Sequence, residues 1–313
     1  MEPVLENEKK IELKKSKISN IKVEEFKDFL TVLPALAFFG VFIYYPLAQL
    51  FNISFTNWNL IKDSYKYVGL KNYQWLYNGS GKAELINSLR VTFIYTLSEV
   101  TITLVGGMLL ALLFGKMTRK YAFMRSIVFM PKYVGMSTAA VVYAWILNGK
   151  YGILNYVLNI FGIPSVDWLT QQSTALIGVL FLTSWRVVGY AMIIYLSAMQ
   201  GISRDYYEAA SLDGATKVQE LRYITIPLLS PTTLFLFVTT FIASMKVFQS
   251  IDVMTGGGPY ESTNVMVYWI YNLAFVDFRV DRAAVTSILF FIILLVCTIL
   301  TMKVSDKSVN YDS

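Results

Sequence analysis

The sequence predicts an all-α integral membrane protein with six transmembrane helices. Hydrophobic residues occupy 55% and aromatic residues 15% of the 313 positions, which exceeds what a soluble domain of this length usually shows. The apolar residues gather in six stretches, each long enough to cross a hydrocarbon core of about 30 Å as a helix. Polar segments separate these stretches, so the chain is expected to cross a lipid bilayer repeatedly.

The predicted spans have few internal charges. The first has 23 residues without a formal charge, and Pro34 and Pro46 are expected to bend it. Gly106 and Gly107 in the second are expected to allow close approach of another helix, because small residues let backbones pack tightly in lipid. The spans cover about residues 29–51, 91–114, 127–147, 173–199, 228–250 and 283–302.

The distribution of basic residues predicts the orientation. Residues 115–125 contain four Lys or Arg and no acid, which is typical of a cytoplasmic loop. With that loop inside, the cytoplasmic segments contain sixteen Lys and Arg, against seven in the external segments. Residues 1–28 and 303–313 are therefore predicted to be cytoplasmic tails around a permease domain of residues 29–302.

The composition excludes most enzymes. The chain has no histidine, and its one cysteine, Cys297, lies in an apolar run, so no disulfide framework, catalytic His or metal site is expected. No Walker signature occurs, so the chain is not expected to hydrolyse ATP or to bind a cofactor. The net charge of +6 follows the membrane topology, which argues against nucleic-acid binding. A membrane transferase would need a cluster of acids, histidines or a metal motif, and none is present.

One polar interruption, residues 203–227, is predicted to form a helix, a sharp turn and a second helix. Ser203 followed by early acids is typical of a helix start, and Asp213-Gly214 breaks that helix. Apolar residues at three-residue spacing then predict a second helical run from Ala215. Pro227 lies where the fifth span is expected to begin. We call residues 203–227 the EAA segment.

The string YEAASLDGATKVQELRYITIP (residues 207–227) resembles the EAA loop of bacterial ABC-importer permeases. Further strings resemble landmarks of the carbohydrate-uptake branch of that family, which includes maltose, oligosaccharide and glycerol-phosphate permeases, and most closely its compact six-span members. These strings are YGILN (151–155), WRVVGY (185–190), KVFQ (246–249) and TGGGP (255–259). The EAA pattern itself is matched by Glu208, Ala209, Ala210, Asp213, Gly214, Ala215, Ile224 and Pro227.

The resemblance implies a MetI-like permease with a cytoplasmic EAA coupling helix. Such a subunit imports a di- or oligosaccharide that an extracellular binding protein delivers, through the bacterial cell membrane. The implied partners are a second homologous permease and two copies of a cytosolic ATPase, which bind the ATP and Mg²⁺. Glycerol-phosphate or another polyol is the alternative cargo. A passive channel or a sensor would not need the EAA segment.

The resemblance also implies which residues contact the ATPase. Glu208 is expected to anchor the coupling helix, the alanines to allow close docking, and Gly214 to permit a backbone that a side chain would block. Plain helix propensity is the alternative reason for the alanines. The ATPase-coupling set is Tyr207, Glu208, Ala209, Ala210, Asp213, Gly214 and Ala215.

The substrate path is implied by carrying positions over from the maltose permease relative. The path residues step by three or four within spans four and five, so each set lies on one helix face. They offer hydroxyl groups and an aromatic face, which a saccharide needs. The set is Thr183, Arg186, Val187, Tyr190, Thr240, Ala243, Ser244 and Val247.

Charged residues at membrane depth are costly and are functional candidates. Glu99 is expected to face the bundle and to pair with Arg186 or Lys246. The rival interpretation is that Arg186 binds the sugar directly; Arg186 and Lys246 could also serve a phosphate. Lys132 and Lys246 lie near span ends, where extension of their long side chains toward the interface is the expected explanation.

Overall fold

The computed structural model describes residues 28–61, 64–115 and 118–308. The predicted N-terminal tail lies outside the described residues except for Asp28, as do residues 309–313 of the predicted C-terminal tail. Lys116, one of the four basic residues in the predicted cytoplasmic loop, also falls outside them.

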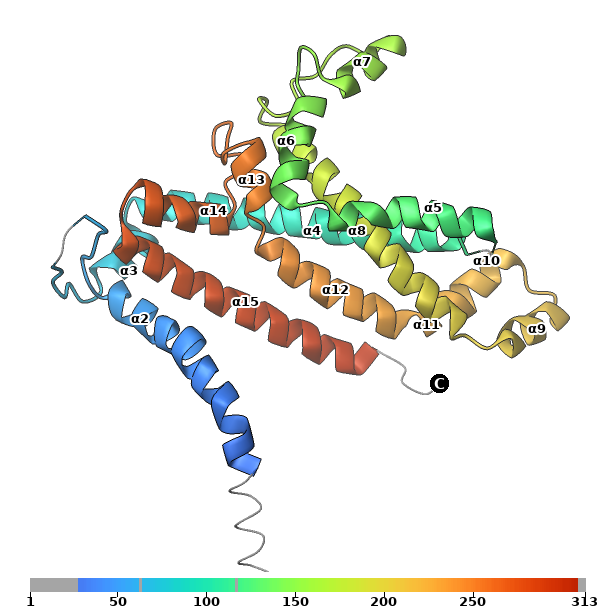
Figure 1. Ribbon diagram of the computed structural model, residues 1–313, viewed down its shortest axis with the longest axis horizontal. Coiled ribbons are helices and arrows are strands. Elements are labelled where there is room, and N and C mark those ends of the chain that lie inside the picture. The colour runs from blue at the N-terminus through green and yellow to red at the C-terminus, as the bar shows by residue number, and fades with distance from the viewer. Residues whose placement is uncertain (1–27, 62–63, 116–117, 309–313) are drawn as a thin grey trace, which may run out of the picture.

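The described residues are almost entirely helical, and their extended pairing is one isolated bridge between Thr56 and Tyr67. In chain order the elements are η1 (Gly40–Tyr44), α2 (Tyr45–Ser54), α3 (Lys71–Asn78), α4 (Gly81–Leu113), α5 (Arg119–Phe129), η2 (Met130–Tyr133), α6 (Met136–Ile146), α7 (Ile153–Ile160), α8 (Ala175–Gln200), α9 (Arg204–Leu212), α10 (Lys217–Glu220), η3 (Leu221–Thr225), α11 (Ile226–Leu228), α12 (Ser230–Met245), α13 (Gln249–Met254), α14 (Met266–Tyr271), η4 (Asn272–Val276) and α15 (Val280–Ser308). The long helices α4, α8, α12 and α15 form a bundle, with α9 and α10 at one end and α3 at the other (Figure 1).

Four helices are long and apolar enough to cross a membrane, and they match predicted spans one, two, four and six. They cover Asp28–Ser54, Gly81–Leu113, Ala175–Gln200 and Val280–Lys303. Two bent helix pairs supply the third and fifth spans, which gives up to six. The helix that contains the second predicted span begins at Gly81, ten residues before residue 91, because the polar residues before the apolar stretch continue the same helix.

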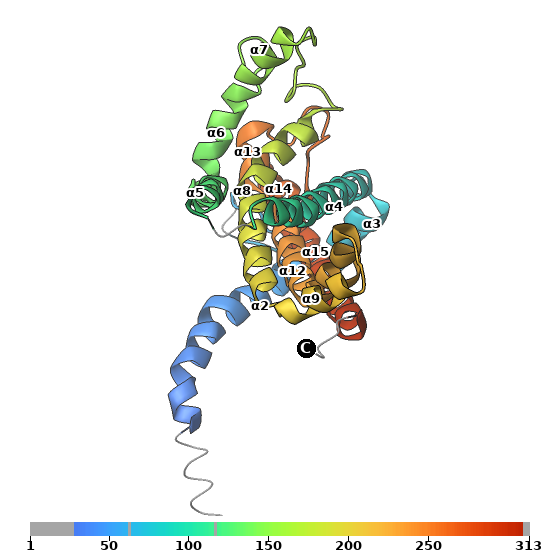
Figure 2. The ribbon, with the colours of Figure 1, turned by 90° about the vertical axis from the view of Figure 1, so that its right-hand side faces the viewer.

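The third span is not the single helix predicted over residues 127–147. Its two parts, Arg119–Tyr133 and Met136–Ile146, are bent by 104°. Pro131 lacks a backbone N–H and lies within a short 3₁₀ turn, and Val134 and Gly135 then adopt extended ψ angles of 129° and 135°. Two extended residues in succession redirect the chain, so α6 and α7 project from the bundle (Figures 1 and 2).

The fifth span is shorter than predicted and broken at its start. The predicted limits were residues 228–250, but α12 ends at Met245 and α13 begins only at Gln249. Leu229, with φ −85° and ψ 0°, interrupts the helix, and Pro231 follows at the start of α12. The axis therefore turns by 62° between the EAA segment and the span.

Small residues bring α4 and α8 into close contact. A Cβ atom added at Gly107 would lie 2.5 Å from the Cβ of Ala191, which no pair of real side chains tolerates. One added at Gly106 would meet Cγ1 of Val188 at 3.2 Å. The predicted close helix approach at these two glycines is confirmed, and it holds α4 and α8 together.

The first span leaves the bundle. The apolar window of Asp28–Ser54 has none of its residues buried, and the helix extends to the side opposite α7 (Figure 2). Pro46 lies in the first turn of α2, next to the π-helical segment η1, where a locally wider helix accommodates it. The helix therefore presents an apolar surface with no partner among the described residues except near its C-terminal end, which contacts α15.

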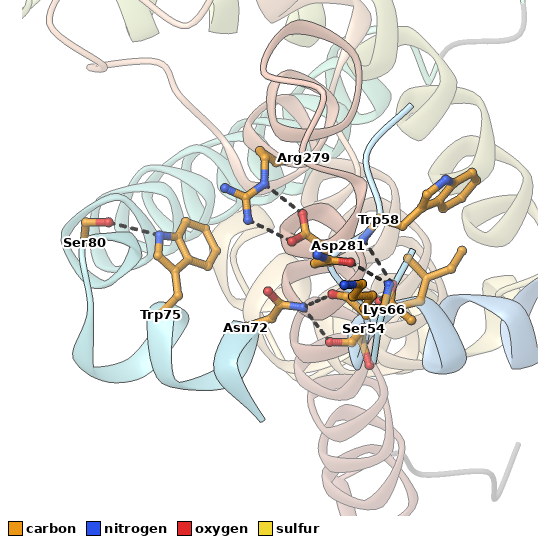
Figure 3. A network of polar contacts seen from close by, with 11 residues as sticks. Ser54, Trp58, Lys66, Asn72, Trp75, Ser80, Arg279 and Asp281 are labelled. Carbon is orange, nitrogen blue, oxygen red and sulfur yellow. Dashed lines mark hydrogen bonds and ion pairs between the residues drawn. The ribbon is translucent and has the colours of Figure 1, made fainter. Parts of the chain in front are cut away.

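Hydrogen bonds join α2, α3 and α15 at one end of the bundle (Figure 3). The buried side chain of Asn72 donates to the carbonyls of Ser54 and Thr56 at 2.9 and 2.7 Å. Arg279 forms a two-point ion pair with the buried Asp281, at 2.8 Å for the shorter contact. Polar contacts therefore hold this end of the bundle together.

Candidate functional site

The EAA segment forms the predicted helix, turn and helix. Ser203 caps α9, since its hydroxyl accepts a hydrogen bond from the N–H of Asp205 at 3.2 Å. Thr216 caps α10 through a capping box with Gln219, although α10 begins at residue 217 and not at Ala215 as predicted. Each helix therefore begins at a capping side chain that bonds to a residue two or three positions further along the chain.

The turn between the two helices depends on Gly214. Its φ is +78°, in the left-handed region that residues with a Cβ adopt at a cost. No atom lies within 4 Å of a Cβ placed there, so the turn has open space around it. The N–H of Ala215 donates to the carbonyl of Ala210 at 2.9 Å, which closes the end of α9. A side chain at position 214 would therefore be disfavoured by the backbone conformation and not by contact with neighbouring atoms.

The EAA segment exposes an apolar surface at one end of the bundle. Leu212 is 90% exposed and Val218 is 73% exposed, and Glu208 and Ala209 are exposed beside them. Tyr207 is half-buried, and its hydroxyl lies 3.0 Å from the hydroxyl of Thr225 in η3, which links α9 to the base of the fifth span. Exposed apolar side chains on a polar segment indicate a surface for a protein partner.

A cavity of about 650 Å³ lies among α4, α8, α12 and the bent third span. Its size falls in the range of about 300–1,000 Å³ that suits small-molecule ligands. It is lined by Tyr95, Glu99, Lys132, Met136, Thr183, Val187, Tyr190, Thr239, Thr240, Ala243, Ser244, Lys246, Val247, Phe248, Gln249 and Ser250.

The structure brings most of the predicted path residues together at this cavity. Seven of the eight line it, three from α8 and four from α12 and the residues just after it: Thr183, Val187, Tyr190, Thr240, Ala243, Ser244 and Val247. Arg186 is absent from the lining. Thr183, Thr240 and Ser244 are buried within the chain; the Thr183 hydroxyl donates to Glu99 of α4, and the Ser244 hydroxyl donates to the Thr240 carbonyl of its own helix. That a substrate passes here stays a prediction.

The predicted ion pair of Glu99 is wrong. Glu99 is buried, and its Oε2 accepts hydrogen bonds from the hydroxyls of Thr183 at 2.8 Å and Ser184 at 3.1 Å. The structure gives it no ion pair with Arg186 or Lys246, all three of which are described. Two neutral donors on α8 therefore satisfy this carboxylate across the α4–α8 contact.

Arg186 instead supports the bend of the third span. Its Nη1 lies 3.2 Å from Sδ of Met136, and its Nη2 donates to the carbonyl of Lys132 at 3.4 Å. Lys132 was expected to extend toward the membrane interface, but its Nζ lies 4.7 Å from the ring centre of Tyr190 and faces the cavity. The two cations are thus neighbours.

The sequence reasoning missed part of the lining. Tyr95 lies one helical turn before Glu99 on α4, so the spacing alone could have placed both on one face. Phe248 and Gln249 belong to the KVFQ string that had been singled out. For Lys132 and Met136 no such signal exists, because they reach the cavity only through the bend of the third span.

Comparisons with known proteins agree with this arrangement. Residues 103–311 match the family described as "Binding-protein-dependent transport system inner membrane component". The "Probable ABC transporter permease protein YurN" of Bacillus subtilis (strain 168) is 30% identical over 279 residues, which cover 88% of this chain and 94% of that protein. The "Trehalose/maltose transport system permease protein MalF" of Thermococcus litoralis is 30% identical over 91% of this chain and 96% of that protein.

A solved structure shares the fold. It is described as a bacterial ABC transporter involved in the import of the acidic polysaccharide alginate, and it matches with a TM-score of 0.78 at 24% identity over 91% of this chain and 96% of that one. This likeness supports the fold alone. The family match and the two relatives go further: the chain belongs to the family of inner membrane components of binding-protein-dependent transport systems, the ABC transporter permeases.

Proposed function

We propose that this permease subunit imports a di- or oligosaccharide that an extracellular binding protein delivers, driven by ATP hydrolysis in separate subunits. The observation that carries the proposal is the cavity of about 650 Å³, whose walls combine hydroxyl groups with aromatic faces. Thr240 and Ser244 offer hydroxyls, and Tyr190 and Phe248 offer ring faces. Saccharides present the same two kinds of surface, hydroxyl edges and apolar ring faces.

The EAA segment is proposed to couple this cavity to the ATPase. α9 follows α8 after the short link Gly201–Ser203, and η3 and α11 lead into α12 through the break at Leu229. A partner that moves α9 and α10 as a unit therefore moves α8 and α12, two of the helices that line the cavity. The Tyr207–Thr225 contact supports this movement, because it joins the two sides of the segment.

We assign the docking contacts to the coupling set named from the sequence. Glu208, Ala209 and Gly214 are exposed at the segment, and Leu212 and Val218 extend the surface with apolar side chains. An ATPase groove would receive the short helix α9, while the turn at Gly214 sets the angle of α10.

The further partners follow from family membership. A second, homologous permease is proposed to cover the open side of the cavity, and two ATPase subunits are proposed to bind ATP and Mg²⁺. The exposed first span offers apolar surface to that second permease or to lipid. Both termini are proposed to lie in the cytoplasm, because that topology puts sixteen of the 27 basic residues on the inner side.

The test uses the assembled importer, purified after co-expression of both permeases, the ATPase and the binding protein. Sugar-loaded binding protein is expected to stimulate ATP hydrolysis, and vesicles are expected to accumulate labelled sugar. Recovery of this chain without any ATPase, together with ATP-independent flux, would favour a passive channel. A stimulation confined to peptides or metal ions would contradict the saccharide assignment.

A further inference from the structure

We propose that the cavity takes an anionic saccharide, whose acidic group is held by Lys132 and Lys246. This inference rests on the proposed function and names the substrate class of the same cavity. The acidic group is a carboxylate or a phosphate ester, since both offer anionic oxygens to ammonium groups.

The first argument is the charge of the lining. Lys132, Lys246 and Glu99 are the charged residues that line the cavity in the described part of the chain. Arg186 adds a fourth charge directly behind Lys132, because its guanidinium donates to the Lys132 carbonyl at 3.4 Å. Three cations and one acid leave this membrane-depth site with a net positive charge.

The second argument is that these cations have no acidic partner among the residues that the structure describes. Ion pairs in the described ranges join Lys217 to Glu220 and Arg279 to Asp281, both far along the chain from the cavity residues. The acid that could compensate, Glu99, gives its Oε2 to two hydroxyls of α8. Both lysines are exposed within the chain, so a bound anion can supply the acidic partner that the described residues do not provide.

The third argument is the geometry of the Lys132 side chain. A lysine that only reaches for the membrane interface would extend its ammonium toward water. Here Nζ lies over the ring of Tyr190, 4.7 Å from its centre, and Lys132 lines the cavity. The ammonium is thereby held against the cavity wall with its donors open to a ligand.

The fourth argument concerns size. Glycerol-phosphate fills a small part of a space of about 650 Å³, whereas a disaccharide uses the aromatic walls as well as the cations. Tyr190 and Phe248 can cover the sugar ring while Lys132 and Lys246 hold its acidic group. The lining thus fits a charged sugar better than a charged polyol.

The test is a binding and ATPase assay on the assembled importer in nanodiscs. The probes are digalacturonate and its neutral dimethyl ester, which removes both charges and adds two methyl groups, with glucose 6-phosphate and glycerol 3-phosphate as the phosphate arm. Digalacturonate or glucose 6-phosphate is expected to bind at least about tenfold more tightly than the neutral ester. Raised salt is expected to weaken that binding.

Variants assign the effect to the two lysines. Lys132→Gln and Lys246→Gln are each expected to weaken binding of the anionic probe by about 10- to 100-fold, while binding of the neutral ester changes little. Lys246→Arg, which keeps the charge, is expected to retain most of the affinity. Lys82→Gln, at an exposed lysine in the first turn of α4, is the matched control and is expected to leave both affinities unchanged.

Two results would overturn the inference. Equal affinity for digalacturonate and its neutral ester would show that the cavity has no preference for charge. An equal loss of affinity for both probes in the Lys246→Gln variant would show the same. Either result contradicts the inference and leaves the saccharide function unaffected. If no saccharide of either charge stimulates the ATPase of the assembled complex, the proposed function fails and the inference fails with it.

Discussion

The EAA segment connects α8 to α12, two helices that also line the cavity, yet the segment and the cavity are built in opposite ways. In the EAA segment, each feature depends on residues close in the chain: Ser203 caps α9, Gly214 makes the turn and Thr216 caps α10. In the cavity, each feature depends on residues far apart, as where Glu99 meets Thr183 across 84 positions. Coupling and binding are therefore separable, and variants in the two regions should fail differently.

The largest effect is expected from Gly214→Val. A β-branched residue at φ +78° costs about 1–2 kcal/mol and shifts the angle between α9 and α10. Sugar-stimulated ATPase activity is expected to fall by at least about tenfold, while ligand binding to the complex is unchanged. The matched control is Gly162→Val, because Gly162 has φ +74° and the same open surroundings but lies beyond α7. Full stimulated activity in the Gly214 variant would contradict the coupling role.

The second prediction perturbs the cavity alone. Glu99→Ala leaves the hydroxyls of Thr183 and Ser184 without their shared acceptor, at a cost of about 1–3 kcal/mol. Substrate binding is expected to weaken, while the ATPase still co-purifies at the normal ratio. Because Glu99 and Arg186 are not paired, a double variant that exchanges their charges is expected to have no more transport activity than the single variants. Recovery of transport in that double variant would show that another conformation forms the pair.

The third prediction tests the close contact between α4 and α8, two of the helices that line the cavity. Gly107→Val places side-chain atoms against Ala191, where even a Cβ would lie 2.5 Å from its neighbour, so α4 and α8 must separate. Overpacking of this kind costs about 1–3 kcal/mol, and the melting temperature of the complex is expected to fall. Gly40→Val is the control, because no atom lies within 4 Å of a Cβ at Gly40. Equal melting temperatures for the two variants would contradict this packing.

The smallest effect is expected from Thr216→Ala. It removes the capping box of α10, which is worth about 0.5–2 kcal/mol of local helix stability. Stimulated ATPase activity is expected to decline by less than in Gly214→Val, and ligand binding is expected to stay normal. Ser211→Ala serves as the control, since the Ser211 side chain is exposed on α9. A loss of binding in the Thr216 variant would show that the two regions are not separable.

Much of the fold was predictable because it depends on local properties. An apolar stretch of some 20 residues must be helical in lipid, where no water satisfies its backbone. The structure has a helix or a bent helix pair at each of the six predicted stretches. The bends were not predictable, because Pro131 and Pro231 are compatible with a straight or a broken span, and neighbouring helices decide which forms.

In the candidate site, too, the features that depend on local spacing were predictable and those that depend on helix packing were not. Helical spacing on α8 and α12, with the family resemblance, was enough to name seven lining residues. The partner of Glu99 was predicted wrongly, because opposite charge suggests an ion pair while the rotation of α4 against α8 presents hydroxyls instead.

The sequence by itself determined the membrane class and the helix–turn–helix form of the EAA segment, because each depends on neighbours along the chain. The tertiary structure alone decided that Lys132 meets Tyr190 at the cavity. That meeting requires a bend of 104° and the packing of separate helices, and only long-range contacts select such an arrangement.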